Sequence, residues 1–181
     1  DARSGKQPAG KQSQKLHSHG CKYTRVTGIW QTVWLEAVPE YHLETVHIVP
    51  DYDNSCFYIT PTFNQEKRDM SFRAVLLDGE EEIVSKKITA NSDCSLKLEL
   101  ENPHSWSIED PFLYNLRFEL LDSGQVIDRV NSYAGLRKFH IEGNKFYLNN
   151  QPIFLRFVLD QGFYPDGIWT ASDDQELKAD I

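Results

Sequence analysis

Hydrophobic and polar residues alternate with a period of two along the middle of the chain. In the segment SLKLELE, Leu96, Leu98 and Leu100 fall on one side of an extended chain, and charged residues fall on the other. The same alternation recurs in SFRAVLL and in YNLRFELL. A strand with one apolar and one polar side is typical of an antiparallel sheet that has one face on a core and one face in water.

Four further segments complete a set of about seven short strands between residues 43 and 133. They are ETVHIV, CFYITPTF, EEIVSKKI and QVIDRVNSY. Turn residues at Asp78-Gly79 and at Asp122-Ser123-Gly124 predict two hairpins, and Pro61 predicts an edge or a bulge because proline donates no ladder hydrogen bond. The pattern therefore predicts an all-β, immunoglobulin-like sandwich of antiparallel strands over residues 41–140.

The pattern changes over residues 141–181. KFYLNNQPIFL predicts a small hairpin that turns at Asn149-Asn150, and IFLRFVLD is a mostly apolar run of the kind found in a buried parallel strand. In TASDDQELKADI, Ser172 and Gln175 have the spacing of a capping box, so a helix is expected to start there. A strand, a loop and a helix start predict the opening of an α/β domain, cut from a longer chain.

Charge is distributed unevenly. Residues 1–27 carry six basic and one acidic side chain, a net charge of +5, whereas residues 28–181 carry 13 basic and 26 acidic side chains, a net charge of -13. The body should therefore repel nucleic acid and anionic membranes. The basic arm has Tyr23 as its one aromatic residue, which favours a solvated tail over a phosphate-binding segment. No stretch approaches the roughly 18 apolar residues of a membrane span.

Tryptophans raise the possibility of sugar binding. Pro103 and Pro111 bracket NPHSWSIEDPFLY and predict a rigid loop that crosses between the sheets, with Trp106 plugging one end of the sandwich. Trp30 and Trp34 share one face of an expected terminal strand, for which core packing is favoured. The alternative in both cases is an indole that stacks on a sugar ring.

Cysteine and histidine spacing gives weak signals. Cys21, Cys56 and Cys94 form an odd set without C-x-x-C spacing, so free thiols are favoured over a Cys56–Cys94 bridge. His17 and His19 alternate with Cys21, but a fourth metal ligand is missing from the sequence pattern. We therefore expect no metal and no cofactor.

The sequence contains no motif that pairs a nucleophile with its base, so no catalytic residue is assigned. One candidate for substrate binding is Asp160, which ends the apolar run and opens the loop DQGFYPDGIW. α/β barrels project functional side chains from this position. Asp160 could equally be a residue that starts the loop.

Several segments together resemble glycoside hydrolase family 2, which includes β-galactosidases and β-glucuronidases. They are YTRVTGIWQTVWLE, NPHSWSIEDPFLYNLRFELL, SYAGLRKFHIEGNKFYLNNQPIFLR and LDQGFYPDGIWTASDDQELKADI. The resemblance implies a basic arm and the last strand of a jelly-roll sugar-binding domain in residues 1–40. It implies an immunoglobulin-like domain in residues 41–140, and the first strand and helix start of a catalytic (β/α)8 barrel in residues 141–181.

The resemblance also implies a function. Family members hydrolyse O-glycosidic bonds of β-linked sugars with retention, using two carboxyl groups about 5 to 5.5 Å apart. Their catalytic glutamates would lie beyond residue 181, so this chain would be an inactive scaffold, with Asp160 at the edge of the sugar pocket. The expected partners are a carbohydrate and, through the exposed apolar ends, a second copy of the chain. The alternative is a non-enzymatic adhesion or carbohydrate-binding module.

Overall fold

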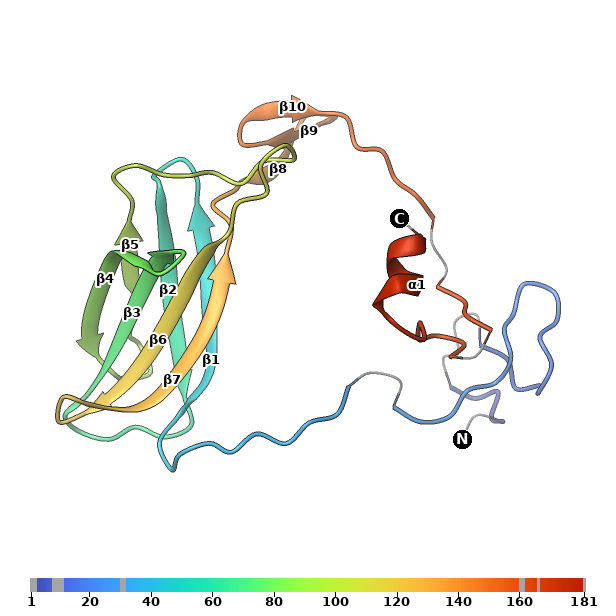
Figure 1. Ribbon diagram of the computed structural model, residues 1–181, viewed down its shortest axis with the longest axis horizontal. Coiled ribbons are helices and arrows are strands. Elements are labelled where there is room, and N and C mark those ends of the chain that lie inside the picture. The colour runs from blue at the N-terminus through green and yellow to red at the C-terminus, as the bar shows by residue number, and fades with distance from the viewer. Residues whose placement is uncertain (1–2, 8–11, 30–31, 160–161, 166, 181) are drawn as a thin grey trace. The chain divides into compact units, whose positions relative to one another are not determined.

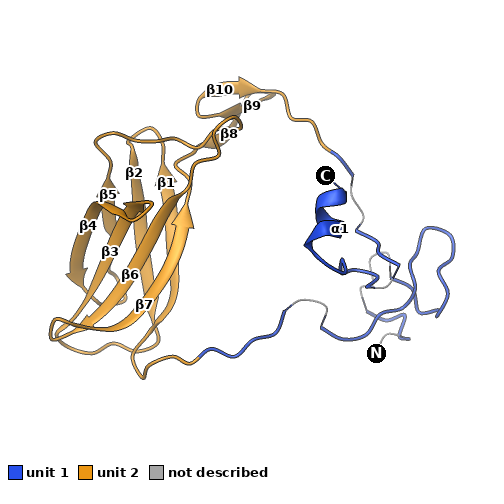
Figure 2. Ribbon diagram, viewed as in Figure 1, with its two compact units in different colours: residues 1–36, 158–181 blue, residues 37–157 orange. Residues whose placement is uncertain are grey.

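The computed structural model describes residues 3–7, 12–29, 32–159, 162–165 and 167–180. Figure 2 shows its two compact units, which are residues 37–157 and the combination of residues 1–36 with 158–181. The larger unit contains every strand of the described chain, and the smaller unit contains its one helix.

The larger unit is an antiparallel β-sandwich (Figure 1). One sheet has the strand order β1-β2-β5 and the other has the order β4-β3-β6-β7. The prediction of an all-β, immunoglobulin-like fold with seven sandwich strands is confirmed. The strands are β1 (Leu43–Asp51), β2 (Cys56–Phe63), β3 (Met70–Asp78), β4 (Glu81–Thr89), β5 (Leu96–Glu99), β6 (Tyr114–Asp122) and β7 (Gln125–Ala134).

The core lies between the two sheets. Phe57 and Leu98 come from the three-stranded sheet, Phe72 and Phe118 come from the four-stranded sheet, and all four side chains are fully buried. The rings of Phe72 and Phe118 stack with their centroids 6.0 Å apart. Burial of each such side chain contributes about 1.5–3 kcal/mol, so the alternating apolar positions of the sequence are the main source of stability.

Turn chemistry defines both predicted hairpins. Gly79 joins β3 to β4 with φ of 57°, and Ser123 and Gly124 join β6 to β7 with φ of 50° and 83°. Two successive residues with positive φ match the right-handed twist of the strands they connect.

Pro61 is not on an edge strand, because β2 is the middle strand of its sheet. Only Cys56–Ile59 of β2 pair with β5, whereas Pro61 pairs with Val46 of β1. Pro61 therefore lies beyond the part of β2 that has a second neighbour, where a missing donor costs little.

A third sheet, antiparallel and three-stranded, follows the sandwich with the order β10-β9-β8. Asn149 and Asn150 form the β9–β10 turn with φ of 50° and 63°, which confirms the predicted hairpin. Residues 154–159 form no strand here, although their sequence resembles one. A strand needs a neighbour for its hydrogen bonds, and none of the described strands pairs with this segment. The sheet consists of β8 (Phe139–Glu142), β9 (Lys145–Leu148) and β10 (Gln151–Ile153).

The smaller unit corrects two details. Helix α1 (Asp174–Ala179) is capped by Asp173 rather than Ser172, because the Asp173 carboxylate accepts hydrogen bonds from the amides of Gln175 and Glu176. Trp34 is 72% exposed, so the expectation that it packs in a core is wrong, and Trp30 lies outside the described residues. Among the described residues, no helix has both the length and the apolar content needed to cross a membrane.

The core makes a direct prediction. Replacing Phe118 by Ala should lower the free energy of unfolding by about 3–5 kcal/mol, because it removes a fully buried ring and leaves a cavity. Urea denaturation measures the effect. Val126→Ala on β7, where the side chain is 42% exposed, should cost less than about 1 kcal/mol. Equal costs for the two variants would contradict the assignment of Phe118 to the core.

Candidate functional site

The candidate site is the junction between the sandwich and the small sheet β8–β10. Both lie within residues 37–157, and Figure 1 shows the small sheet at one end of the sandwich. This position determines the direction in which the chain leaves the sandwich after β10.

An acidic side chain in the β1–β2 turn links the two parts. The Asp53 carboxylate accepts a hydrogen bond from Lys138 Nζ at 2.5 Å and another from Asn150 Nδ2 at 2.8 Å. Lys138 directly precedes β8, and Asn150 directly precedes β10. Asp53 thus forms hydrogen bonds with residues that directly precede the two edge strands of the small sheet.

The pKa of Asp53 is lowered by this arrangement. The hydrogen bond from Lys138 is the largest cause, the one from Asn150 comes next, and the charges of Lys138 and His140 add to them. All of these contacts favour the ionised carboxylate. The linkage is consequently at full strength only when Asp53 is charged.

Asn149 forms a second connection between the small sheet and the sandwich. Its side-chain oxygen accepts from the amide of Lys138 at 3.0 Å, and its Nδ2 donates to the carbonyl of Trp106 at 2.8 Å. Its own amide donates to the carbonyl of Lys138 at 2.8 Å. One asparagine therefore joins the β9–β10 turn, the start of β8 and the loop between β5 and β6.

Trp106 is part of the same junction, in agreement with the prediction that it closes one end of the sandwich. Its amide donates to the carbonyl of Leu136 at 3.1 Å, and the Arg137 guanidinium lies 4.7 Å from the ring centroid. A Cβ at Gly135 would come within 3.2 Å of the Trp106 Cβ, so glycine permits this close approach. The half-buried indole is thus held in place at this end of the sandwich, with the Arg137 guanidinium over its ring.

The loop that carries Trp106 is itself braced. The His104 ring stacks on Phe112 with a centroid distance of 3.8 Å and lies 2.6 Å from the Asp110 carboxylate, measured from Nε2 to Oδ2. The amide of His104 donates to the hydroxyl of Tyr114 at 2.6 Å. The predicted rigid crossing from β5 to β6 is thus confirmed, because β5 and β6 lie in different sheets.

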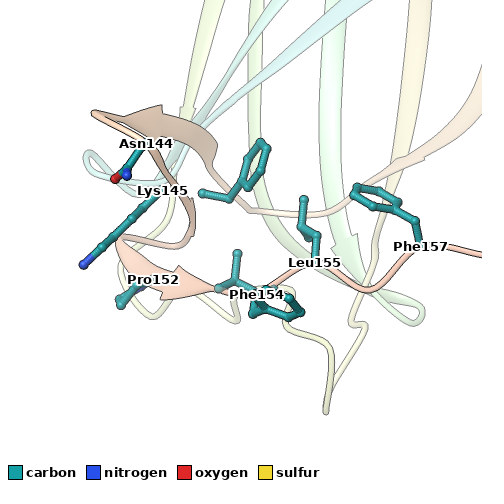
Figure 3. A pocket seen from close by; sticks show the side chains of 8 residues that line it. Asn144, Lys145, Pro152, Phe154, Leu155 and Phe157 are labelled. Atoms are coloured by element: carbon teal, nitrogen blue, oxygen red, sulfur yellow. The ribbon is translucent and has the colours of Figure 1, made fainter.

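An apolar hollow of about 510 Å³ lies beside the small sheet (Figure 3). Leu155 and Phe157 point to one side of the chain and Phe154 to the other. Phe154 and Phe157 are more than four-fifths exposed. Among the described residues, none of those that line the hollow is acidic. Its lining is Asn144, Lys145, Phe146, Pro152, Ile153, Phe154, Leu155 and Phe157.

The remaining residues singled out in the sequence do not gather into a second site. Asp160, the predicted substrate-binding residue, lies outside the described residues. Cys21 is an exposed free thiol, and Cys56 and Cys94 are buried free thiols. Within the described ranges, no three histidine, cysteine, aspartate or glutamate side chains form a group that could hold a metal ion.

Comparison with known proteins identifies the family. A sequence model described as Glycosyl hydrolases family 2 matches residues 41–137, which are the seven sandwich strands and the start of the junction. That match covers more than half of the chain. The chain therefore belongs to glycosyl hydrolase family 2.

Individual relatives agree. The chain is 31% identical over 137 residues to a putative β-glucuronidase of Formosa agariphila, which covers 71% of this chain and 17% of the relative. It is 30% identical over 142 residues to a β-galactosidase of Streptococcus thermophilus, which covers 75% of this chain and 14% of the relative. The chain thus spans less than a fifth of the length of either protein.

Solved structures show the same fold. A β-glucuronidase from Ruminococcus gnavus in complex with C6-substituted uronic isofagomine matches with a TM-score of 0.66 and 20% identity. The match covers 80% of this chain and 24% of that chain. At this level of identity the likeness concerns the fold alone.

Sequence reasoning missed the central residue of the junction. Asp53 lies in a polar turn, DYDNS, whose composition predicts only a turn. Its partners follow 85 and 97 residues later. No local pattern encodes a contact over that separation.

Changing Asp53 should loosen the junction without unfolding the sandwich. Asp53→Asn keeps the size of the side chain but removes the charge that Lys138 and Asn150 contact, so amides of β8–β10 should exchange roughly two- to fivefold faster. Hydrogen exchange read by NMR measures this. Glu101→Gln, at an exposed carboxylate in the β5–β6 loop, is the matched control. Equal acceleration in β6 would show that Asp53 instead supports the whole sandwich.

The junction should also weaken in acid. Because the folded-state pKa of Asp53 is lowered from 3.8, its contribution is complete above that value and is lost as the pH falls through the lower folded pKa. The protection of β8–β10 relative to β6 should be constant from neutral pH to about pH 5 and fall below roughly pH 3.8. Asp53→Asn should abolish this pH dependence. A pH dependence that persists in the variant would assign it to another group.

Proposed function

We propose that this chain provides the immunoglobulin-like scaffold of a retaining glycosidase that hydrolyses β-linked sugars. The observation that carries the proposal is the family match over residues 41–137, which coincides with the sandwich. The named relatives are β-glucuronidases and β-galactosidases, and the proposed substrate is a carbohydrate of that general class.

In this proposal, the role of the junction is to orient the domain that follows it. A catalytic domain that follows the small sheet would be oriented by the contacts of Asp53, Asn149 and Trp106. Catalytic groups must be held within about 0.5 Å of productive geometry, so a rigid connection to a stable sandwich contributes to activity indirectly. The exposed apolar segment around Phe154 and Phe157 supports this proposal, because it offers a hydrophobic surface on which a further domain can pack.

The domain assignment extends the same proposal. Residues 1–40 would be an arm and the last strand of a sugar-binding jelly roll, and residues 141–181 would begin a catalytic barrel. The two catalytic glutamates would come from parts of the enzyme outside residues 1–181, and no residue of this chain is proposed as catalytic. Asp160 would contact the sugar from the end of the first barrel strand.

The proposed partners follow from charge and exposed surface. The substrate is a carbohydrate, and the net charge of -8 disfavours nucleic acid and anionic membranes. Self-association is proposed through the apolar residues that follow β10, where Phe154 is 86% and Phe157 is 83% exposed. Further family domains and a second copy would compete for this same surface.

Enzyme assays test the proposal. The whole reading frame that encodes this chain should hydrolyse 4-nitrophenyl β-D-galactoside or 4-nitrophenyl β-D-glucuronide, and residues 1–181 alone should hydrolyse neither. In the whole enzyme, Asp160→Asn should raise KM with a smaller effect on kcat, because the side chain is proposed to bind substrate. The matched control is Asp93→Asn, at an exposed residue of the sandwich.

Two outcomes would contradict the proposal. Turnover by residues 1–181 that disappears in Asp160→Asn would place catalytic groups inside this chain. Absence of β-glycosidase activity from the whole reading frame would leave a non-enzymatic binding module as the better description.

A further inference from the structure

The outer face of the four-stranded sheet carries three arginines, Lys87 in register with Arg73, and two glutamates. Arg73 pairs in register with Glu119, and Glu119 pairs with Arg129 on the other side, so one row of charges crosses β3, β6 and β7. Arg117 lies two residues before Glu119 on β6, and Glu82 lies on β4. With Glu80 of the adjoining β3–β4 turn, which makes a third acidic side chain, this face has four positive and three negative charges, so one positive charge is in surplus.

Both carboxylates are already occupied. Glu119, whose side chain is 4% exposed, accepts hydrogen bonds from Arg129 Nε at 3.1 Å and from Arg73 Nη1 at 3.4 Å. Glu82 accepts from Arg73 Nη2 at 3.1 Å and from Ser85 Oγ at 2.6 Å. The hydrogen bond from Ser85, and after it the charge of Arg73, lowers the pKa of Glu82 against the effect of burial.

Arg117 is the arginine of this cluster whose hydrogen bonding is incomplete. Its Nε lies 3.4 Å from Glu119 Oε1 and its Nη2 lies 3.8 Å from Glu82 Oε2, both within ion-pair range. Its Nε–H is buried and unsatisfied within the described chain. A buried donor without an acceptor is costly, and arginine is shaped for two parallel bonds to one carboxylate.

A polar hollow of about 380 Å³ opens beside this guanidinium. Arg117, Arg129, Asn115 and Asn131 line it, and Glu80 is the acidic member of the lining. Asn131 pairs in register with Arg117 across β6 and β7. Amide and guanidinium donors thus share one concave space, which is large enough for a small polar molecule.

We propose that this hollow binds a small monocarboxylate, with the Arg117 guanidinium as its anchor and the Asn131 amide beside it. One surplus positive charge matches a single negative charge. A phosphate dianion would add a second negative charge close to Glu80, Glu82 and Glu119, and is disfavoured. The site does not depend on the proposed glycosidase activity, because its anchoring residues Arg117 and Asn131 lie on β6 and β7 of the sandwich.

The probe for the site is D-gluconate, with the neutral polyol D-glucitol as its matched control. In NMR titrations of this chain at low salt, gluconate should shift the backbone amides of Arg117 and Asn131 with a Kd on the order of 1 mM. Acetate should shift the same amides more weakly. Glucitol and phosphate should leave them in place. Absence of shifts up to about 50 mM gluconate, or equal shifts with glucitol, would overturn the proposal.

Two variants assign the site. Arg117→Gln should weaken gluconate binding about tenfold or more, because it removes the anchoring charge. Asn131→Asp places a carboxylate opposite Arg117. This carboxylate should pair with the guanidinium, so it should abolish gluconate binding and raise Tm by about 2 °C. Asn102→Asp, at an exposed position in the β5–β6 loop, controls for the change in net charge and should alter neither property.

The second variant keeps the proposal falsifiable if Arg117→Gln does not fold. Unchanged gluconate affinity in Asn131→Asp would show that the anion does not bind at Arg117. A lower Tm in Asn131→Asp than in Asn102→Asp would show that an added carboxylate does not stabilise the cluster.

Discussion

The structure depends on the packing of two apolar sheet faces against each other. Phe57 from one sheet and Phe72 and Phe118 from the other are completely buried, and no other part of the described chain has a comparable core. The free energy gained by hydrophobic burial is roughly proportional to the buried area and is not directional. It therefore holds the two sheets together but does not orient segments outside them. Every directional feature of this protein is therefore built on the sandwich from polar contacts.

The junction is the clearest of these features. Asp53 and Trp106 come from two loops at one end of the sandwich, and their hydrogen bonds to Asn150 and Asn149 attach the small sheet. Each bond is near the surface and contributes little by itself. Several bonds with different directions nevertheless define one orientation of the small sheet on the sandwich.

On the outer face of the four-stranded sheet, polar and charged side chains cover apolar surface. Val75 is fully buried there although it points away from the core, and Arg117 is its neighbour in the ladder. Long arginine side chains cover apolar surface with their methylene groups and keep their charged ends in contact with carboxylates. Among the described residues the Nε–H of Arg117 nevertheless finds no hydrogen-bond acceptor, and this observation is part of the basis of the inferred anion site.

The seven sandwich strands, their hairpins and the family could be predicted from the sequence, because they depend on local alternation, turn residues and short motifs such as NPHSWSIEDPFLY. Strand β8 and the absence of a strand over residues 154–159 could not. The sequence also identified the Asn149-Asn150 turn, but not its contacts. Asp53 with Lys138, and Arg117 with Glu119 and Glu82, were decided by the tertiary structure alone. Such pairs depend on how strands distant in sequence are brought into register, and the period of a single strand carries no information about which charge will lie opposite.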